Sequence, residues 1–268
     1  MLRIGVSGAA GRMGYSVISA ICQSADAGLT LSAAIHRPDS NFLGLDAGEM
    51  VGARTLGVPI VESIDEAEFD LLIDFTLPNP CLAHIEFCVS NKKPVVIGTT
   101  GFSASQLKDI TAASSKIPIV LAPNMSVGVN LALHLLNAAG SALDDSYDIE
   151  ILETHHRNKI DAPSGTALAM GEAIAAAKGR SLEQCAVYDR NARREPRQTG
   201  SIGFASVRAG DVVGEHTVLF ASEDERIEIT HKASKRHTFS KGALRAASWL
   251  STQSAGLYSM QNVLGLVD

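Results

Sequence analysis

The chain has 268 residues, of which 46% are hydrophobic and 19% are charged, a composition typical of a folded protein with room for two domains. Its formal net charge of -6 disfavours general attraction to nucleic acid or to an anionic membrane surface, because either would repel the chain at long range. We therefore expect a small-molecule ligand, and no nucleic-acid or membrane partner.

The chain opens with the pattern of a strand, a glycine loop and a helix. Residues 2–7 form an apolar run, residues 8–14 read G-A-A-G-R-M-G, and residues 15–21 have the apolar spacing of a helix. Glycine lets a diphosphate approach the backbone, and the helix N-terminus then faces its negative charge. The G-x-x-G-x-x-G spacing is one residue off the usual dinucleotide motif, so on its own it also fits a simple tight turn.

Strands and helices go on alternating through the first half of the chain. Buried parallel strands are indicated by four apolar runs, at residues 29–35, 71–75, 94–98 and 117–121. Helical spacing follows in two further segments, at residues 81–90 and 105–114. This order predicts an α/β fold, a Rossmann-like doubly wound parallel sheet. We assign it to residues 1–126 together with residues 237–268 as a dinucleotide-binding domain.

Ligands of such sheets bind at the carboxyl ends of the strands. Three strand ends are therefore expected to surround the cofactor, Asp74-Phe75-Thr76, Gly98-Thr99-Thr100-Gly101 and Ala122-Pro123-Asn124-Met125. With the glycine loop and the end of the second strand, the individual candidates are Gly8, Ala9, Ala10, Gly11, Arg12, Met13, His36, Arg37, Gly98, Thr99, Thr100, Ala122, Pro123, Asn124 and Met125. An acid after the second strand would favour NAD by binding the ribose, but this chain has His36-Arg37 there. Because Arg37 could pair with a 2′-phosphate, the sequence favours NADPH and leaves NADH possible.

The pattern changes after residue 126. A helix rich in Leu and Ala is predicted over residues 127–143. Alternation of polar and apolar residues then indicates four strands, at residues 147–153, 202–207, 213–220 and 226–231. They predict a second, α+β domain built on a mixed sheet over residues 127–236, for substrate binding and oligomerisation. An exposed face of this sheet could serve as an oligomer interface.

Three expectations concern the connections. The run with Arg190, Arg193, Arg194 and Arg197 is expected to be a solvated loop. Helices at residues 241–251 and 258–266 are expected to return to the first domain. Because the glycine loop and the substrate segment fall in different domains, we expect closure about hinges near Val127 and Arg236.

The segment from Glu153 to Thr166 concentrates groups suited to binding an anion. Ser164 is the expected N-cap of a helix over residues 167–174. The N–H groups of Gly165 and Thr166 would then face out of a helix N-terminus, where an anion is favoured. Positive charge or donors come from the same loop, at His156 and Lys159. The sequence thus predicts a carboxylate cradle.

His155 has the chemistry of a proton donor. Histidine can deliver a proton near neutral pH, which reduction of a C=C or C=N bond requires once hydride has arrived. Neighbouring strand residues point to opposite faces, so His155 and His156 cannot both bind one metal ion. We therefore expect no metal.

The cysteines and the termini of the chain indicate its compartment. Cys22, Cys81, Cys88 and Cys185 have neither C-x-x-C spacing nor histidines in metal-ligand register, so neither zinc nor a disulfide framework is expected. No basic segment with a long apolar run precedes the first strand, and no run approaches the ~20 residues of a membrane span. A cytoplasmic protein is the simplest expectation.

Several long motifs in the same order resemble the dihydrodipicolinate reductase family, also called 4-hydroxy-tetrahydrodipicolinate reductase, over essentially the whole chain. The motifs are E-T-H-H-R-N-K-I-D-A-P-S-G-T-A from Glu153, G-R-M-G from Gly11, V-I-G-T-T-G from Val96, N-M-S-V-G-V-N from Asn124 and R-A-G-D-V-V-G-E-H from Arg208. The chain departs from the family at His36, where many members have an acid, and at Met125, where an aromatic residue is common. The first departure puts NADH use in doubt more than NADPH use.

The resemblance implies a function and roles for residues. It implies hydride transfer from NAD(P)H to C4 of the cyclic dihydrodipicolinate, in lysine and diaminopimelate biosynthesis, by a homotetramer. His155 matches the family's proton donor and Lys159 its second catalytic group. The substrate-binding positions match His156, Gly165 and Thr166.

Two other classes of protein remain open on the residues alone. Another Rossmann-type NAD(P)-dependent oxidoreductase, such as a semialdehyde dehydrogenase, would need a thiol nucleophile, and Cys185 lacks a base nearby in sequence. A non-catalytic NAD(P)-sensing protein would need a recognition helix or a basic face, and the sequence predicts neither.

Overall fold

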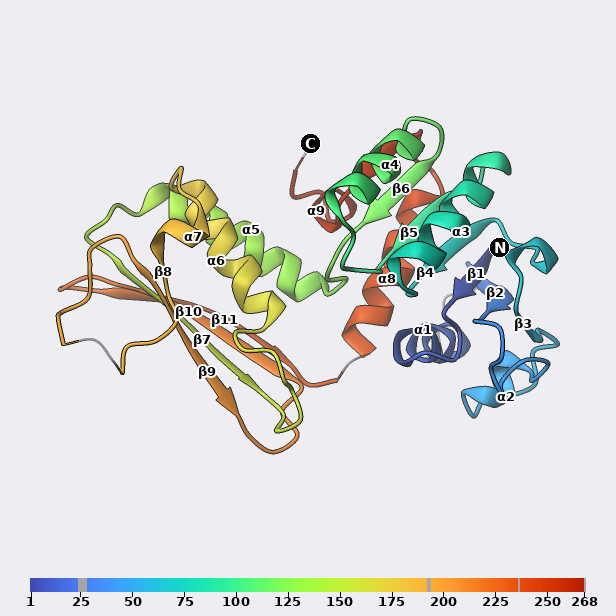
Figure 1. The fold of residues 1–268 in the computed structure, drawn as a ribbon, viewed down its shortest axis with the longest axis horizontal. Helices are drawn as coiled ribbons and strands as arrows, with labels where there is room; N and C mark the ends of the chain where they lie inside the picture. Colours follow the sequence, from blue (N-terminus) through green and yellow to red (C-terminus); the bar gives the residue numbers. More distant parts are fainter. Residues whose placement is uncertain (24–27, 192–193, 236, 268) are drawn as a thin grey trace. The chain divides into compact units, whose positions relative to one another are not determined.

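The chain forms two compact units in the computed structural model, which describes residues 1–23, 28–191, 194–235 and 237–267 (Figure 1). Unit 1 comprises Met1–Val127 and His237–Asp268, and unit 2 comprises Gly128–Arg236. Two residues named above, Arg193 of the polar loop and Arg236 at a predicted hinge, lie outside the described residues. No helix in the described part is long and apolar enough to cross a membrane.

Unit 1 is built on a parallel sheet of seven strands, in the order β12-β6-β5-β4-β1-β2-β3. The strands are β1 (Leu2–Ser7), β2 (Leu29–Ile35), β3 (Ile60–Val61), β4 (Leu71–Asp74), β5 (Val95–Ile97), β6 (Pro118–Leu121) and β12 (Gly256–Tyr258). The order runs outward in both directions from the β1–β4 pair, which creates a topological switch point there. The predicted Rossmann-like doubly wound sheet is confirmed.

Helices cover both faces of this sheet. They are α1 (Arg12–Gln23), α2 (Ala47–Met50), α3 (Pro78–Ser90), α4 (Ala104–Ser114), α8 (His237–Leu250) and α9 (Met260–Val263), with a short 3₁₀ helix at Ile64–Glu66. Leu71 and Ile73 of β4 pack in one core with α1 and α8, while Leu72 packs in a second core with α3 and α4. Because successive strand residues face opposite sides, the nearly continuous apolar runs of the sequence supply both cores.

The C-terminal segment contains a helix within the expected range of residues 258–266, but this helix is shorter than predicted. Tyr258 ends β12, whose Leu257 pairs in parallel with Ile119 of β6. The capping box of Ser259 then starts α9, which ends by Val263. A strand of three residues is too short to show a period of two, and the two-residue strand β3 escaped prediction for the same reason.

Unit 2 contains a mixed sheet of five strands, in the order β11-β10-β7-β9-β8, which confirms the predicted mixed sheet. The strands are β7 (Asp148–His155), β8 (Ala186–Val187), β9 (Ile202–Arg208), β10 (Gly214–Ala221) and β11 (Arg226–Ala233). The helices are α5 (Val127–Ala142), which begins at the boundary of the units, α6 (Gly165–Ala177) and the short α7 (Leu182–Cys185). One sheet face packs against α5 and α6, with Ile149 and Ile151 of β7 fully buried.

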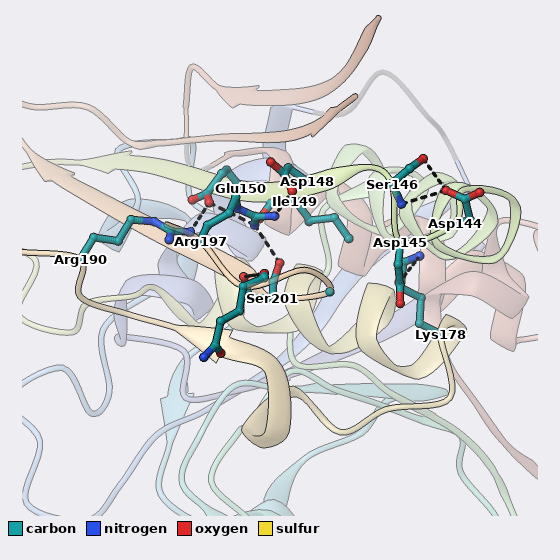
Figure 2. Close-up of polar contacts among 12 residues, drawn as sticks. Asp144, Asp145, Ser146, Asp148, Ile149, Glu150, Lys178, Arg190, Arg197 and Ser201 are labelled. Carbon is teal, nitrogen blue, oxygen red and sulfur yellow. Dashed lines mark hydrogen bonds and ion pairs between the residues drawn. The ribbon is translucent and has the colours of Figure 1, made fainter. Parts of the chain in front are cut away.

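The described residues of the arginine loop of unit 2 are mostly exposed, as expected, but Arg190 and Arg197 are ion-paired. Arg197 pairs with Asp148 and Glu150 and donates to the carbonyl oxygen of Ser201 at 2.9 Å (Figure 2). Arg190 also pairs with Glu150. The carboxylates of β7 hold these two guanidinium groups. Each ion pair joins residues about 40 to 50 positions apart in the sequence, which local composition cannot reveal.

Candidate active site

In unit 1, the glycine loop joins β1 to α1 in a very close turn. Gly8 has a φ of +79°, and a Cβ atom on it would lie 2.6 Å from the carbonyl oxygen of Phe75. A Cβ atom on Gly14 would lie 2.2 Å from the carbonyl oxygen of Gly8. Both positions therefore require glycine. The loop also borders a cavity, which the alternative of a simple tight turn does not explain.

That cavity has a volume of about 370 Å³ and lies at the carboxyl ends of β1, β2 and β4. Gly8, Gly11, His36 and Arg37 line it, together with Thr76. Its floor of glycine backbone at the start of α1 suits a phosphate group, and its apolar lining suits a nucleoside. These residues fit a dinucleotide cofactor at the predicted place.

His36 and Arg37 contribute different properties to the cavity. Arg37 is exposed, and no ion pair involves it within the described ranges. Burial lowers the pKa of His36, and the charge of Arg37 lowers it further. At neutral pH Arg37 therefore supplies a positive charge beside a neutral His36, and position 36 carries no carboxylate, although Glu62 also lines the cavity.

The other cofactor candidates lie at strand ends with varied exposure. Met125 is only 1% exposed and packs in the core of unit 1. Thr99 is also buried, whereas Thr100 is exposed. Gly98 is required by packing, because a Cβ atom on it would lie 2.0 Å from the Phe75 ring.

Asp74 belongs to a strand end predicted to surround the cofactor, and in the structure it connects the neighbouring strand ends. It is fully buried at the end of β4. Its Oδ1 accepts hydrogen bonds from the Thr99 hydroxyl at 2.8 Å and from the Thr76 hydroxyl at 2.7 Å, and its Oδ2 accepts from Nδ1 of His84 at 2.6 Å. A single carboxylate thus links the loops after β4 and β5 to α3.

In unit 2, the sheet brings four polar side chains together at one end of its covered face. Glu153 and His155 continue the alternation that buries Ile149 and Ile151, so they face the same side. The strand register places Arg208 of β9 beside His155 and His216 of β10 beside Glu153. We call these four residues the His155 cluster.

Hydrogen bonds join the His155 cluster. Nδ1 of His155 donates to Oε2 of Glu153, since a carboxylate can only accept. Arg208 donates from Nη1 to Oε2 of Glu153 at 3.0 Å and from Nη2 to Oε1 at 2.8 Å. Burial raises the pKa of Glu153, but hydrogen bonds from Arg208 and its neighbours outweigh this effect and leave that pKa below its ordinary value. Burial also lowers the pKa of His155, against the opposing effect of Glu153.

His216 connects the cluster to the start of α6. Its ring lies edge-on to that of His155, with centroids 5.1 Å apart, and its Nε2 lies 3.0 Å from Oγ of Ser164. Ser164 is the N-cap of α6, as predicted, and its Oγ accepts from the Ala167 N–H at 3.2 Å. Burial, and then the charge of His155, lower the pKa of His216 from 6.5 to about 4. His216 is therefore neutral at physiological pH.

A metal ion was not expected here, yet one atom each of Glu153, His155 and His216 lie within 4.8 Å of one another. This spacing would suit a three-ligand site. However, both carboxylate oxygens of Glu153 accept from Arg208, whose positive charge would repel a cation at the same place. The arrangement is better described as a hydrogen-bonded cluster around His155.

The loop after β7 holds the remaining candidates. Lys159 donates from Nζ to both carboxylate oxygens of Asp161 at 2.8 Å, and this pairing lowers the pKa of Asp161. Arg208 also donates to the carbonyl oxygen of Asp161 at 2.6 Å. Gly165 is exposed at the first turn of α6, with no atom within 4 Å of where its Cβ would lie. Unit 2 thus gathers His155, the Lys159 loop and a helix N-terminus at one end of its sheet.

Comparison with known proteins gives consistent matches over both units. The family model for the N-terminus of dihydrodipicolinate reductase matches residues 2–125, and that for its C-terminus matches residues 128–264. The 4-hydroxy-tetrahydrodipicolinate reductases of Methylococcus capsulatus and Pseudomonas fluorescens are each 56% identical to this chain. The alignments cover 99% of this chain in both cases, and 99% and 100% of those proteins.

A solved structure has the same fold. It is the dipicolinate-bound dihydrodipicolinate reductase from Paenisporosarcina sp. TG-14, which aligns with a TM-score of 0.77 over 98% of this chain and 99% of that one. At 23% sequence identity, this likeness concerns the fold.

The low pKa of His216 predicts a pH-dependent stability. Between its ordinary pKa of 6.5 and its folded value of about 4, the unfolded chain binds more protons than the folded chain, so stability falls as the pH drops through this range. In urea unfolding between pH 7.5 and 4.5, the wild type should lose on the order of 2 kcal/mol more than His216→Gln. A control variant, His134→Gln on α5, should follow the wild type. Parallel curves for the wild type and His216→Gln would contradict the prediction.

Proposed function

This chain belongs to the dihydrodipicolinate reductase family, and we propose that His155 is its proton donor and Lys159 its second catalytic group. It is an NAD(P)H-dependent oxidoreductase, a 4-hydroxy-tetrahydrodipicolinate reductase of lysine and diaminopimelate biosynthesis. The observation that carries the site assignment is the buried Glu153–His155 hydrogen bond beside the N-terminus of α6.

The substrate is a cyclic dicarboxylate, and unit 2 offers groups of the matching charge. We assign one carboxylate to the exposed first turn of α6, where Gly165 and Thr166 present backbone N–H groups at the positive end of the helix. His156, next to His155 in the chain, is the third binding residue of this proposal. A carboxylate held at these points fixes the ring, so that one ring carbon and one proton acceptor are presented in defined positions.

The proton step falls to His155. When bound, NAD(P)H would supply a hydride, and the reduced ring would then have to take up a proton. The His155 Nδ1–H is held by Glu153, so Nε2 is the atom that delivers the proton. Lys159 places an ammonium group in the same loop, oriented by Asp161, where it favours negative charge on the substrate.

The cofactor is assigned to unit 1, at the glycine loop and strand ends. Gly8 to Met13 would receive the diphosphate, His36 and Arg37 the ribose, and the loops after β5 and β6 the nicotinamide end. NADPH is the proposed preferred form, because the exposed Arg37 can form charge-assisted bonds to a 2′-phosphate. NADH lacks that phosphate and loses this interaction.

We propose a cytoplasmic homotetramer that assembles through the open face of the unit 2 sheet. On this face Leu152 and Val207 are 45% and 50% exposed. A second copy would cover their apolar surface and remove it from water. The four cysteines are all free, as in proteins of a reducing compartment.

The function is tested by oxidation of NADPH, followed optically while aspartate semialdehyde and pyruvate are condensed enzymatically to supply the substrate. The wild type should oxidise NADPH rapidly. His155→Ala should lower kcat about 10²- to 10⁴-fold, the usual contribution of a positioned acid, and Lys159→Ala should also lower it strongly. His134→Gln should retain wild-type activity. Absence of oxidation by the wild type would refute the function, and full activity of both alanine variants would refute only the site assignment.

Arg37→Ala tests the cofactor preference. Loss of one charge-assisted contact should raise the KM for NADPH about 10- to 100-fold and change the KM for NADH less than about 2-fold. Arg54→Ala removes an exposed arginine of unit 1 outside the cavity lining and serves as the control for net charge. Equal effects of Arg37→Ala on both cofactors would exclude a role in binding the 2′-phosphate.

A further inference from the structure

Arg208, which has no role in the function proposed above, forms an ion pair with the buried Glu153. The side chain of Glu153 is 1% exposed and that of Arg208 is 19% exposed. Removing two charges from water costs about as much free energy as their attraction returns, so a buried ion pair is weak evidence for stability. The contacts of this pair give a better explanation of its position.

Arg208 reaches toward both proposed catalytic residues. Through its fork of hydrogen bonds it holds Glu153, which in turn accepts from Nδ1 of His155. Its Nη2 also donates to the carbonyl oxygen of Asp161 at 2.6 Å, and the carboxylate of Asp161 holds Nζ of Lys159. One guanidinium group thus links Glu153 of β7, which holds His155, to the loop that carries Lys159.

This arrangement determines which nitrogen of His155 can deliver a proton. Because Nδ1–H is engaged by Glu153, the exchangeable proton of the imidazolium lies on Nε2. The ring fits here because Gly214 has no side chain: a Cβ atom on Gly214 would lie 3.0 Å from Nε2 of His155. On delivery the Nε2–H bond breaks, its electron pair stays on the ring, and Glu153 keeps its hydrogen bond to Nδ1.

We propose that Glu153 and Arg208 are positioning residues of the reaction, which orient His155 for proton delivery from Nε2 and fix the loop that carries Lys159. The proposal rests on the function proposed above. Arg208 keeps Glu153 ionised, and ionised Glu153 stabilises the imidazolium form of His155 before the proton is delivered. Neither residue exchanges a proton with the substrate.

The charges that face His155 come from several elements. Glu153 of β7 raises the pKa of His155, while Lys159 of the following loop and Arg208 of β9 lower it. His216 of β10 packs against the ring, and His231 of β11 lies beside His216 in the strand register. Glu153 is therefore the carboxylate that supports the charged form, and its removal should move the pKa of His155 further down.

The test is the pH dependence of kcat for Glu153→Gln, measured with the full-length enzyme and NADPH. A general acid loses activity as the pH rises through its pKa in the enzyme–substrate complex. The loss of kcat at high pH forms the descending limb of the pH profile. In Glu153→Gln this descending limb should move about one pH unit lower, and kcat should fall about 10- to 100-fold. The KM for the substrate should change less than about 3-fold, because Glu153 acts through His155.

Two further variants separate positioning from general stability. Glu150→Gln removes another ion-paired glutamate of β7, and its descending limb should coincide with that of the wild type. Arg208→Lys keeps the positive charge but loses the fork that holds Glu153 and Asp161 together. It should lower kcat about 10-fold with little shift of the limb.

The outcomes distinguish this proposal from the underlying function. If the wild type fails to reduce the substrate, the proposed function is refuted. If the wild type is active and the limb of Glu153→Gln coincides with that of the wild type, the positioning role is refuted while the function stands. Should Glu153→Gln fail to fold by circular dichroism, wild-type kcat in Arg208→Lys would overturn the proposal instead.

Discussion

A carboxylate with almost no access to water needs a partner within reach, and in unit 2 this constraint acts on Glu153. Arg208 satisfies both of its oxygens, and His155 donates to one of them. These bonds leave the other ring nitrogen of His155 as the atom for proton exchange. The same guanidinium holds the backbone of Asp161 and so restricts the loop with Lys159. The chemistry proposed for unit 2 depends on the hydrogen bonds that compensate the buried charge of Glu153.

Unit 1 also contains a buried carboxylate, that of Asp74, which is held by different partners. Asp74 is fully buried at the end of β4, and hydroxyl groups of Thr76 and Thr99 donate to it together with the ring of His84. In both units a carboxylate at a strand end is held by donors from neighbouring elements, and the loops proposed to meet a ligand are anchored to it. The hydrogen bonds compensate the charge, and in doing so they fix loop positions that backbone packing alone would leave adjustable.

The sequence predicted those features that depend on local patterns. Apolar runs identified the central strands of the unit 1 sheet, and polar–apolar alternation identified those of the unit 2 sheet. Glycine spacing identified the loop before α1, and Ser164 identified the start of α6. Features that depend on pairing across the chain were missed. Arg208 lies 55 residues from Glu153, and nothing in its own neighbourhood indicates that partner. The in-facing positions of β7 did carry a signal, because the alternation that buries Ile149 and Ile151 continues to Glu153 and His155.

The most direct test of the central interaction is the tautomer of His155, read from the nitrogen chemical shifts of protein labelled with ¹⁵N-histidine and assigned with His155→Gln. Because burial lowers the pKa of His155, the ring is neutral at pH 8. The account predicts a protonated Nδ1 and an unprotonated Nε2 there, and loss of this preference in Glu153→Gln. A neutral ring protonated on Nε2 in the wild type would contradict it, since Glu153 would then hold no proton of His155.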